Sequence, residues 1–393
     1  MNINRLMVLI GACGVHLSIG TVYAWSVMTK PIVEMMGWSL TDVTITFSIA
    51  IFFLGMSAGF LGNYVQKWGA KKGVWVATGF FTSGLFVSAL AIHLKSLFLL
   101  YLGYGVLGGI GLGVGYISPV ATLLKWFPEK RGFAGGCAVM SFGFAAFISS
   151  PYMQRSIEAF GVEKTFIYLG LVYGIIMCIS AMLIKPPPYD IETQNIDVYE
   201  IEGVSTAIHS RPFILLWVVF FINITCGIAL LSIASPMGQN IGMTTAEAAS
   251  MVGMLGLYNG AGRIICATIS DYLGRAKTYF YFFIIETISF AALSFTTNID
   301  IFMMLMVLII GCYGGGFSCM PAFLVDLFGL KHLSVIHGRI LTAWGFAGIA
   351  GPLLLTNVYE LTGDYTHVMV FFSLLFMFSS LIAAILIGYT KNK

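Results

Sequence analysis

Apolar runs of about twenty residues recur along the whole chain, and this recurrence limits the folds that the chain can adopt. A helical run of that length matches the thickness of the hydrocarbon core of a bilayer. Only 9% of the 393 residues are charged, whereas about a quarter are charged in an ordinary soluble domain. Because a helix satisfies its own backbone hydrogen bonds in lipid, we expect an all-α membrane protein.

The apolar runs divide into twelve expected membrane-spanning helices. They lie at about residues 5–28, 43–62, 74–93, 97–119, 132–152, 165–185, 212–235, 247–270, 278–297, 301–325, 335–357 and 366–389. The only long polar stretch, Lys185–Pro212, separates the sixth span from the seventh. We therefore expect an N-terminal half at 1–185, a cytoplasmic linker at 186–211 and a C-terminal half at 212–393.

The distribution of lysine and arginine predicts the orientation of the chain. With the N-terminus inside the cell, 14 of the 20 basic residues lie in cytoplasmic loops and termini, four lie outside, and Arg263 and Arg339 fall within spans. Because positively charged loops stay in the cytoplasm, we expect both termini and the linker there. The expected location is the inner (plasma) membrane of the cell, and the expected oligomeric state is a monomer.

The two halves of the chain resemble each other at a shift of 205 residues. PIVEMMGWSLTD at Pro31–Asp42 aligns with PMGQNIGMTTAE at Pro236–Glu247, and both end in the Ser/Thr-x-x-acid pattern of a helix capping box. At the same shift, GNYVQKWGAKK at Gly62–Lys72 aligns with ATISDYLGRAK at Ala267–Lys277. Two parallel six-helix halves indicate a transporter that works by alternating access.

Several motifs resemble those of a known family. SDYLGRAK at Ser270–Lys277 is similar to the G-x-x-x-D-R-x-G-R-K loop of the major facilitator superfamily, although the first-half copy has Gln66 in place of the aspartate. KWFPEKRGFAGG at Lys125–Gly136 and TAWGFAGIAGP at Thr342–Pro352 resemble the oxalate/formate antiporter family, which includes bacterial monocarboxylate carriers. The resemblance covers nearly the whole chain and implies two pseudo-symmetric halves around a central anion site.

One arginine lies inside an expected span, where a charge costs about 2.5–3.5 kcal/mol or more and usually has a function. Arg263 is separated from Asp271 by about 12 Å of helical rise, and Asn259 precedes it by one turn. A guanidinium can hold a carboxylate through two parallel hydrogen bonds, and the resemblance places the substrate arginine of the family here. We predict that Arg263 and Asn259 bind the substrate; the alternative is a structural ion pair.

Aromatic residues on the expected cavity-lining helices are further candidate substrate contacts. They are His16 and Tyr23 on the first helix, Tyr116 on the fourth, and Tyr313 and Phe317 on the tenth. The resemblance implies an aromatic cage at these positions. A hydroxyl can bond the anion while the rings exclude water, and the alternative is ordinary packing between helices.

The eleventh helix departs from the oxalate carrier, which has a lysine in a TAKG sequence. This chain has TAWG, with Trp344 at that position. Arg263 would then be the one fixed positive charge, so a dianion would remain half compensated in a site of low dielectric. The substitution favours a small monocarboxylate over oxalate.

Two groups are candidates for proton coupling, Glu286 and His16. Glu286 is the only carboxyl group well inside an expected span, and it could neutralise Arg263 when the site is empty. Its alternatives are a fixed ionic partner or a buried neutral acid. At the expected cytoplasmic face, Asp271 and Arg275 are candidate gating contacts.

The sequence contains no arrangement of a nucleophile and a base, so we expect no enzymatic activity, and we expect no cofactor, no metal and no nucleic-acid partner. The predicted function is secondary active transport of a small monocarboxylate such as lactate, pyruvate or formate, driven by proton symport. The alternatives are exchange against a counter-anion and a carboxylate sensor with the same fold. The sequence names neither the anion nor the direction of transport.

Overall fold

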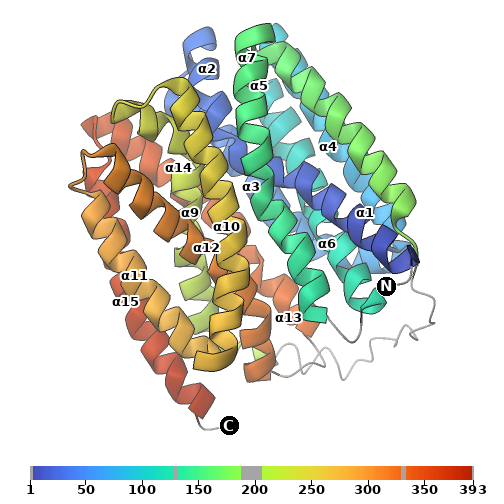
Figure 1. The fold of residues 1–393 in the computed structure, drawn as a ribbon, viewed down its shortest axis with the longest axis vertical. Coiled ribbons are helices and arrows are strands. Elements are labelled where there is room, and N and C mark those ends of the chain that lie inside the picture. Colours follow the sequence, from blue (N-terminus) through green and yellow to red (C-terminus); the bar gives the residue numbers. More distant parts are fainter. Residues whose placement is uncertain (1–2, 128–130, 187–205, 329–332, 392–393) are drawn as a thin grey trace.

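The computed structural model of the protein describes residues 3–127, 131–186, 206–328 and 333–391, and in this part of the chain the regular secondary structure is helical (Figure 1). The expected all-α class is therefore confirmed. The N-terminal elements are α1 (Ile3–Ile19), η1 (Gly20–Ala24), α2 (Ser26–Met36), α3 (Leu40–Trp68), α4 (Ala70–His93), α5 (Leu97–Leu100), η2 (Tyr101–Gly108), α6 (Gly109–Trp126) and α7 (Arg131–Leu183). The C-terminal elements are α9 (Arg211–Asn240), α10 (Thr245–Leu273), α11 (Arg275–Leu293), α12 (Ile299–Phe328), α13 (Leu333–Ile340), α14 (Thr342–Thr362) and α15 (Thr366–Lys391).

Eleven helical segments in the described residues are long and apolar enough to cross a membrane. One of them, Cys137–Leu183, has 47 residues, which is enough for two crossings. Gly161 interrupts it with a φ of 80°, and the expected fifth and sixth spans lie on either side of this residue. The segments therefore accommodate twelve spans, and α1 begins at the same end of the molecule at which α15 finishes (Figure 1).

Two expected spans differ from the structure in continuity. The first breaks at the 3₁₀ segment Gly20–Ala24, where α7 approaches the backbone closely. The approach is so close that a side chain at Gly20 would collide with the carbonyl oxygen of Phe142. The expected loop at 153–164 is helical except at Gly161, so the helices run beyond the apolar stretch. The expected linker at 186–211 lies largely outside the described residues.

The internal repeat is visible in the helix boundaries. Helices α3 and α10 both contain 29 residues, and both are preceded by a complete capping box, at Ser39 with Asp42 and at Thr244 with Glu247. The glycines that end them, Gly69 and Gly274, have φ values of 79° and 83°. The predicted capping boxes and the shift of 205 residues are thus confirmed.

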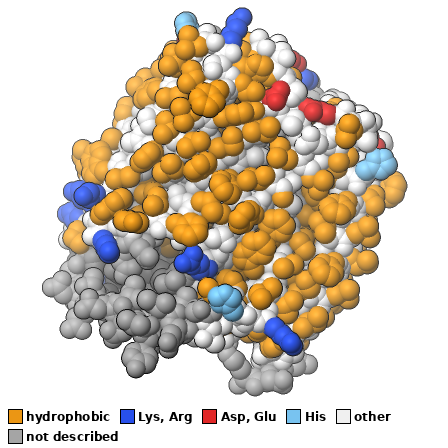
Figure 2. All heavy atoms as spheres, turned by 180° about the vertical axis from the view of Figure 1, so that it is seen from behind, with side chains coloured by type: hydrophobic (Ala, Val, Ile, Leu, Met, Phe, Trp, Pro, Cys, Tyr) orange, Lys and Arg blue, Asp and Glu red, His pale blue; other side chains and the backbone are white. Residues whose placement is uncertain are grey.

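The most extensive contacts between the halves are those of α7 with α10, α3 with α14, and α2 with α9. On the surface, hydrophobic side chains cover the middle of the face in Figure 2, and charged side chains lie toward its ends and edges. Many large apolar side chains are exposed, as Ile175, Ile288 and Leu381 illustrate. An apolar exterior of this kind suits contact with lipid rather than with water.

Candidate functional site

Arg263 lies at the contact between α10 and α7 and is only 3% exposed. Its Nε donates to Oδ1 of Asn259 at 3.3 Å, and its Nη1 donates to the backbone carbonyl of Val139 at 2.8 Å. Nη2 has no hydrogen-bond partner, although the hydroxyls of Tyr23 and Tyr116 lie near enough to the guanidinium to interact with it. In the described part of the chain no carboxylate forms an ion pair with Arg263, so the guanidinium is a buried charge with one free hydrogen-bonding edge.

Aromatic rings enclose this guanidinium. The carbon at its centre lies 5.3 Å from the ring of Phe317 and 5.9 Å from the ring of Phe142. The Phe317 ring in turn contacts Trp344 at 4.7 Å and Tyr313 at 5.4 Å, both edge to face. Rings in these orientations stabilise a cation and keep water out of the site.

Trp344 and Tyr116 close the cage between the halves. Their rings lie 5.4 Å apart, and Tyr116 stacks on His16 at 5.2 Å. Trp344 is fully buried, yet its Nε1 donor has no partner, and the same holds for Nδ2 of Asn259. The site therefore presents three unused N–H donors, which suits a ligand made of hydrogen-bond acceptors.

All eight residues predicted to contact the substrate lie in this one cluster. Arg263, Asn259, Phe317, Tyr313, Trp344, Tyr116, His16 and Tyr23 are linked by the ring contacts and hydrogen bonds above and by the Tyr23–Tyr313 pair. The contacts bring the predicted residues together; their role in binding stays a prediction.

Phe142 is a cage residue that the sequence analysis missed. It is fully buried and contacts the rings of His16, Tyr23, Tyr116 and Trp344 as well as Arg263. Its motif, SFGF, repeats approximately as AWGF in the other half, and Trp344 in that second copy is also a cage residue. The repeat was therefore the one signal that could have identified it.

Glu286 lies apart from this cluster. It is fully buried on α11, and the thiols of Cys226, Cys266 and Cys312, which belong to α9, α10 and α12, lie near it. Neither of its carboxyl oxygens has a hydrogen-bond partner, and Arg263 is not its neighbour. The direct pair between Glu286 and Arg263 that the sequence suggested is therefore absent from the described residues in this conformation.

The two candidate gating residues contact each other. Arg275 forms an ion pair with Asp271, donates to the hydroxyl of Ser270, and has its Nε 3.8 Å from a carboxyl oxygen of Asp326 on α12. This network joins the ends of α10, α11 and α12 within one half of the molecule. Whether it gates transport stays a prediction.

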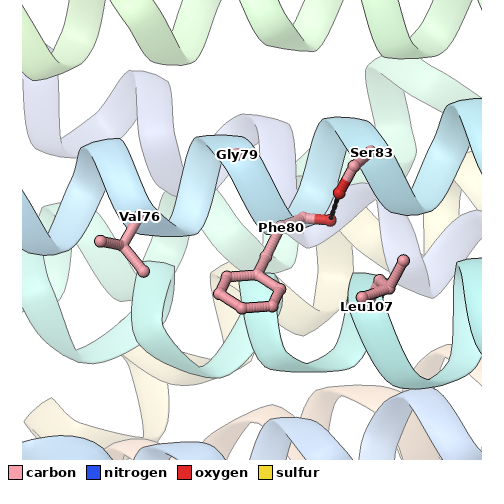
Figure 3. Close-up of a pocket in the computed structure, with 5 residues that line it drawn as sticks. All are labelled: Val76, Gly79, Phe80, Ser83 and Leu107. Atoms are coloured by element: carbon pink, nitrogen blue, oxygen red, sulfur yellow. Dashed lines mark hydrogen bonds between the residues drawn. The ribbon is translucent and has the colours of Figure 1, made fainter.

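A surface groove of about 360 Å³ lies on the outer face of α4 and η2, away from the cage (Figure 3). Val76, Gly79, Phe80, Ser83 and Leu107 line it. Its one hydroxyl, on Ser83, already donates to the carbonyl of Phe80 at 3.1 Å. The groove therefore has no free polar group for a charged substrate.

Comparison with known proteins places this architecture in a family. The family model described as Major Facilitator Superfamily matches residues 8–352 and 215–392 of the chain. The chain is 26% identical over 349 residues to the uncharacterized MFS-type transporter YhjX of Escherichia coli (88% of this chain, 86% of that protein). It is 26% identical over 345 residues to the oxalate:formate antiporter of Oxalobacter formigenes (86% and 82%).

More distant matches agree with this placement. Monocarboxylate transporter 12 of Xenopus laevis is 23% identical over 363 residues, covering 84% of this chain and 76% of that protein. The crystal structure of a D-xylose-proton symporter superimposes with a TM-score of 0.74 at 15% identity, covering 98% of this chain and 97% of the other, and so shares the fold. The chain therefore belongs to the Major Facilitator Superfamily, as a multi-pass membrane transporter rather than an enzyme.

Proposed function

We propose that this protein carries a small monocarboxylate, of the size of lactate, pyruvate or formate, by alternating access. The observation that carries the proposal is the free edge of Arg263, a buried guanidinium with no carboxylate partner among the described residues. A buried, unpaired charge is costly, so the site gains most from a ligand that brings one negative charge. Nη2 of Arg263 and Nδ2 of Asn259 are the donors that would hold it.

The proposal that the substrate carries one negative charge rather than two rests on Trp344. The oxalate carrier that the chain resembles has a lysine at this position, whereas here the indole of Trp344 packs against Phe317 and Tyr116. The relatives named above include an oxalate:formate antiporter and a monocarboxylate transporter, which supports a small anion as substrate. Among the residues that the structure describes, the cage contains no second fixed cation, and this difference favours the monocarboxylate.

Contacts across the halves support alternating access around the cage. At the end of the molecule away from the termini, Nζ of Lys30 donates to Gln239 and the backbone N–H of Thr41 donates to Glu360, both at 2.8 Å. We assign these contacts to a gate on that side and the Asp271–Arg275 network to the opposite side. With the termini and the linker in the cytoplasm of a cell-membrane protein, the first gate faces outward.

The test is uptake of radiolabelled pyruvate, L-lactate or formate into proteoliposomes, compared with empty liposomes. We expect uptake above leak, and Arg263→Lys should reduce it at least tenfold because lysine keeps the charge but loses the planar pair of donors. Arg155→Lys, at an exposed arginine of α7, is the matched control. Full transport by Arg263→Lys would remove the anion role from this residue.

The same assay, together with a thermal-shift measurement of ligand binding, separates the alternatives. Ligand-dependent thermal stabilisation without any flux would identify a sensor, because binding alone then survives. Uptake that needs an internal anion and ignores a pH gradient would identify an exchanger of the oxalate/formate type. Accumulation driven by an inward proton gradient supports symport, which is the mode we propose.

A further inference from the structure

His16 and Arg263 contact neighbouring carbonyl groups of the same helix. Nδ1 of His16 lies 2.7 Å from the carbonyl oxygen of Ala138, and Nη1 of Arg263 donates to the carbonyl oxygen of Val139 at 2.8 Å. Both carbonyls belong to α7. An imidazole from the N-terminal half and a guanidinium from the C-terminal half are thus held on successive peptide groups.

Both ring nitrogens of His16 face hydrogen-bond acceptors. The second nitrogen, Nε2, lies 3.0 Å from the carbonyl oxygen of Tyr116 on α6. A carbonyl only accepts, and a neutral imidazole carries a single N–H, so the neutral ring satisfies one of its two contacts. The imidazolium ion satisfies both, and the two carbonyls therefore form a ready-made site for a second proton.

The groups around His16 determine when that proton binds. From α10 the positive charge of Arg263 acts on the ring, and from α6 the Tyr116 ring stacks on it. Two thiols lie close to it along the chain: Cys13 precedes His16 by three residues on α1, and Cys137 precedes Ala138, whose carbonyl contacts the ring, on α7. Among the described residues no carboxylate hydrogen-bonds to His16 or Arg263, so two effects oppose a second positive charge: first the burial of the ring, and then the positive charge of Arg263.

We propose that His16 is the residue that takes up the coupled proton, and that it does so when a substrate anion binds to Arg263. This inference rests on the proposed carboxylate transport. A bound monoanion cancels the guanidinium charge, so the imidazolium can form and complete both of its carbonyl bonds. Proton and anion then favour each other by linkage, and the site carries the same net charge empty and loaded.

Glu286 does not fit this role as well. Its surroundings are thiols and Tyr279 rather than the anion site, and its oxygens have no donor among the described residues. A buried carboxyl group in such a place is stable as the neutral acid, and anion binding at Arg263 does not change its nearest charges. His16, in contrast, touches a ring of the cage and shares α7 with Arg263.

The experiment measures proton uptake on adding pyruvate to the purified full-length protein in weakly buffered detergent solution near pH 7.5, with a pH-indicator dye. Binding is measured in parallel by calorimetry. We expect about one proton to be taken up per bound pyruvate, no uptake with His16→Gln, and undiminished uptake with Glu286→Gln. Glutamine keeps one N–H for a backbone carbonyl but cannot be protonated.

The outcomes separate the two proposals. Absence of pyruvate, L-lactate and formate binding in the wild type counts against the proposed function. Three other outcomes overturn the role of His16 but leave the proposed function standing. They are pyruvate binding without proton uptake, proton uptake that persists in His16→Gln, and proton uptake that is lost in Glu286→Gln. If His16→Gln does not fold, ¹⁵N-histidine NMR of the wild type decides: ligand must convert one buried histidine from the neutral to the doubly protonated form.

Discussion

The hydroxyl of Tyr23 lies 2.9 Å from the hydroxyl of Tyr313, and this hydrogen bond joins the two halves of the molecule beside Arg263. Both side chains are fully buried, so the bond is shielded from water. It can persist only while η1 and α12 stay together. The pair is therefore suited to hold the closed form of the cage.

We predict that Tyr313→Phe loosens the closed cage without preventing folding. Loss of one net hydrogen bond contributes about 1 kcal/mol, or about a fivefold change in the closing equilibrium. The measurement is the rate of substrate release from the purified protein. Tyr23→Phe should have a similar effect, and the double variant should be no worse than either single variant, because both remove the same bond. Additive effects in the double variant would show that the two hydroxyls act separately.

Trp344→Lys should shift selectivity toward dianions. The new ammonium group would add a second positive charge to a cage that has one fixed cation, so the affinity for oxalate relative to L-lactate should rise about tenfold, equivalent to ~1.4 kcal/mol. Calorimetric titration of both anions measures the ratio. Trp344→Met is the control, because it removes the indole without adding charge. Equal ratios in the lysine and methionine variants would assign the change to volume alone.

Much of the fold could be predicted from local sequence. The capping boxes at Ser39 and Thr244 act through side chains within one helical turn, so their pattern sufficed. The break at Gly20–Ala24 could not be predicted in this way, because it depends on the backbone of α7, which lies more than a hundred residues further along the chain. Hydropathy marks where a chain can cross lipid, but not where helices press against each other.

The site could be predicted where its chemistry is rare. A single arginine in an apolar helix is conspicuous, and Asn259 follows from helical spacing. Phe142 is one of 32 phenylalanines, so nothing in its local sequence separates a cage residue from a lipid-facing one. The distance between Glu286 and Arg263 depends on how α10 packs against α11, and a pattern within one helix carries no such information.

Close packing of glycines across the halves gives a steric prediction. A Cβ atom on Gly55 of α3 would lie 2.6 Å from the Cα of Gly345 on α14, which is closer than carbon atoms approach without displacement. Gly55→Ala should therefore disfavour this closed conformation by about 1–3 kcal/mol of strain. We expect the rate of transport to fall about fivefold or more as a result. Proteoliposome uptake measures it. Gly79→Ala, where the added atom meets open space in the groove of Figure 3, should transport normally. Equal loss in both variants would point to general helix effects.

The contacts at the end away from the termini predict how that side opens. Lys30 with Gln239, which is partly buried, and Thr41 with Glu360, which is exposed, connect the halves there, and each contact contributes about 0.5 kcal/mol. We expect the double variant Gln239→Ala/Glu360→Ala to raise the population open on that side about fivefold. Distances between spin labels at Met35 and Thr245 in a cysteine-free background measure this population.

The matched control for that gate is Asn240→Ala. Asn240 donates to the hydroxyl of Tyr359 at 2.8 Å at the same end of the molecule, but both residues belong to the C-terminal half. Its loss removes a hydrogen bond of the same length without separating the halves, so the label distances should stay as in the wild type. The gate assignment fails if Asn240→Ala opens the molecule as much as the double variant does. It fails equally if the double variant leaves the distances unchanged, because the two cross-half contacts would then have no part in closure.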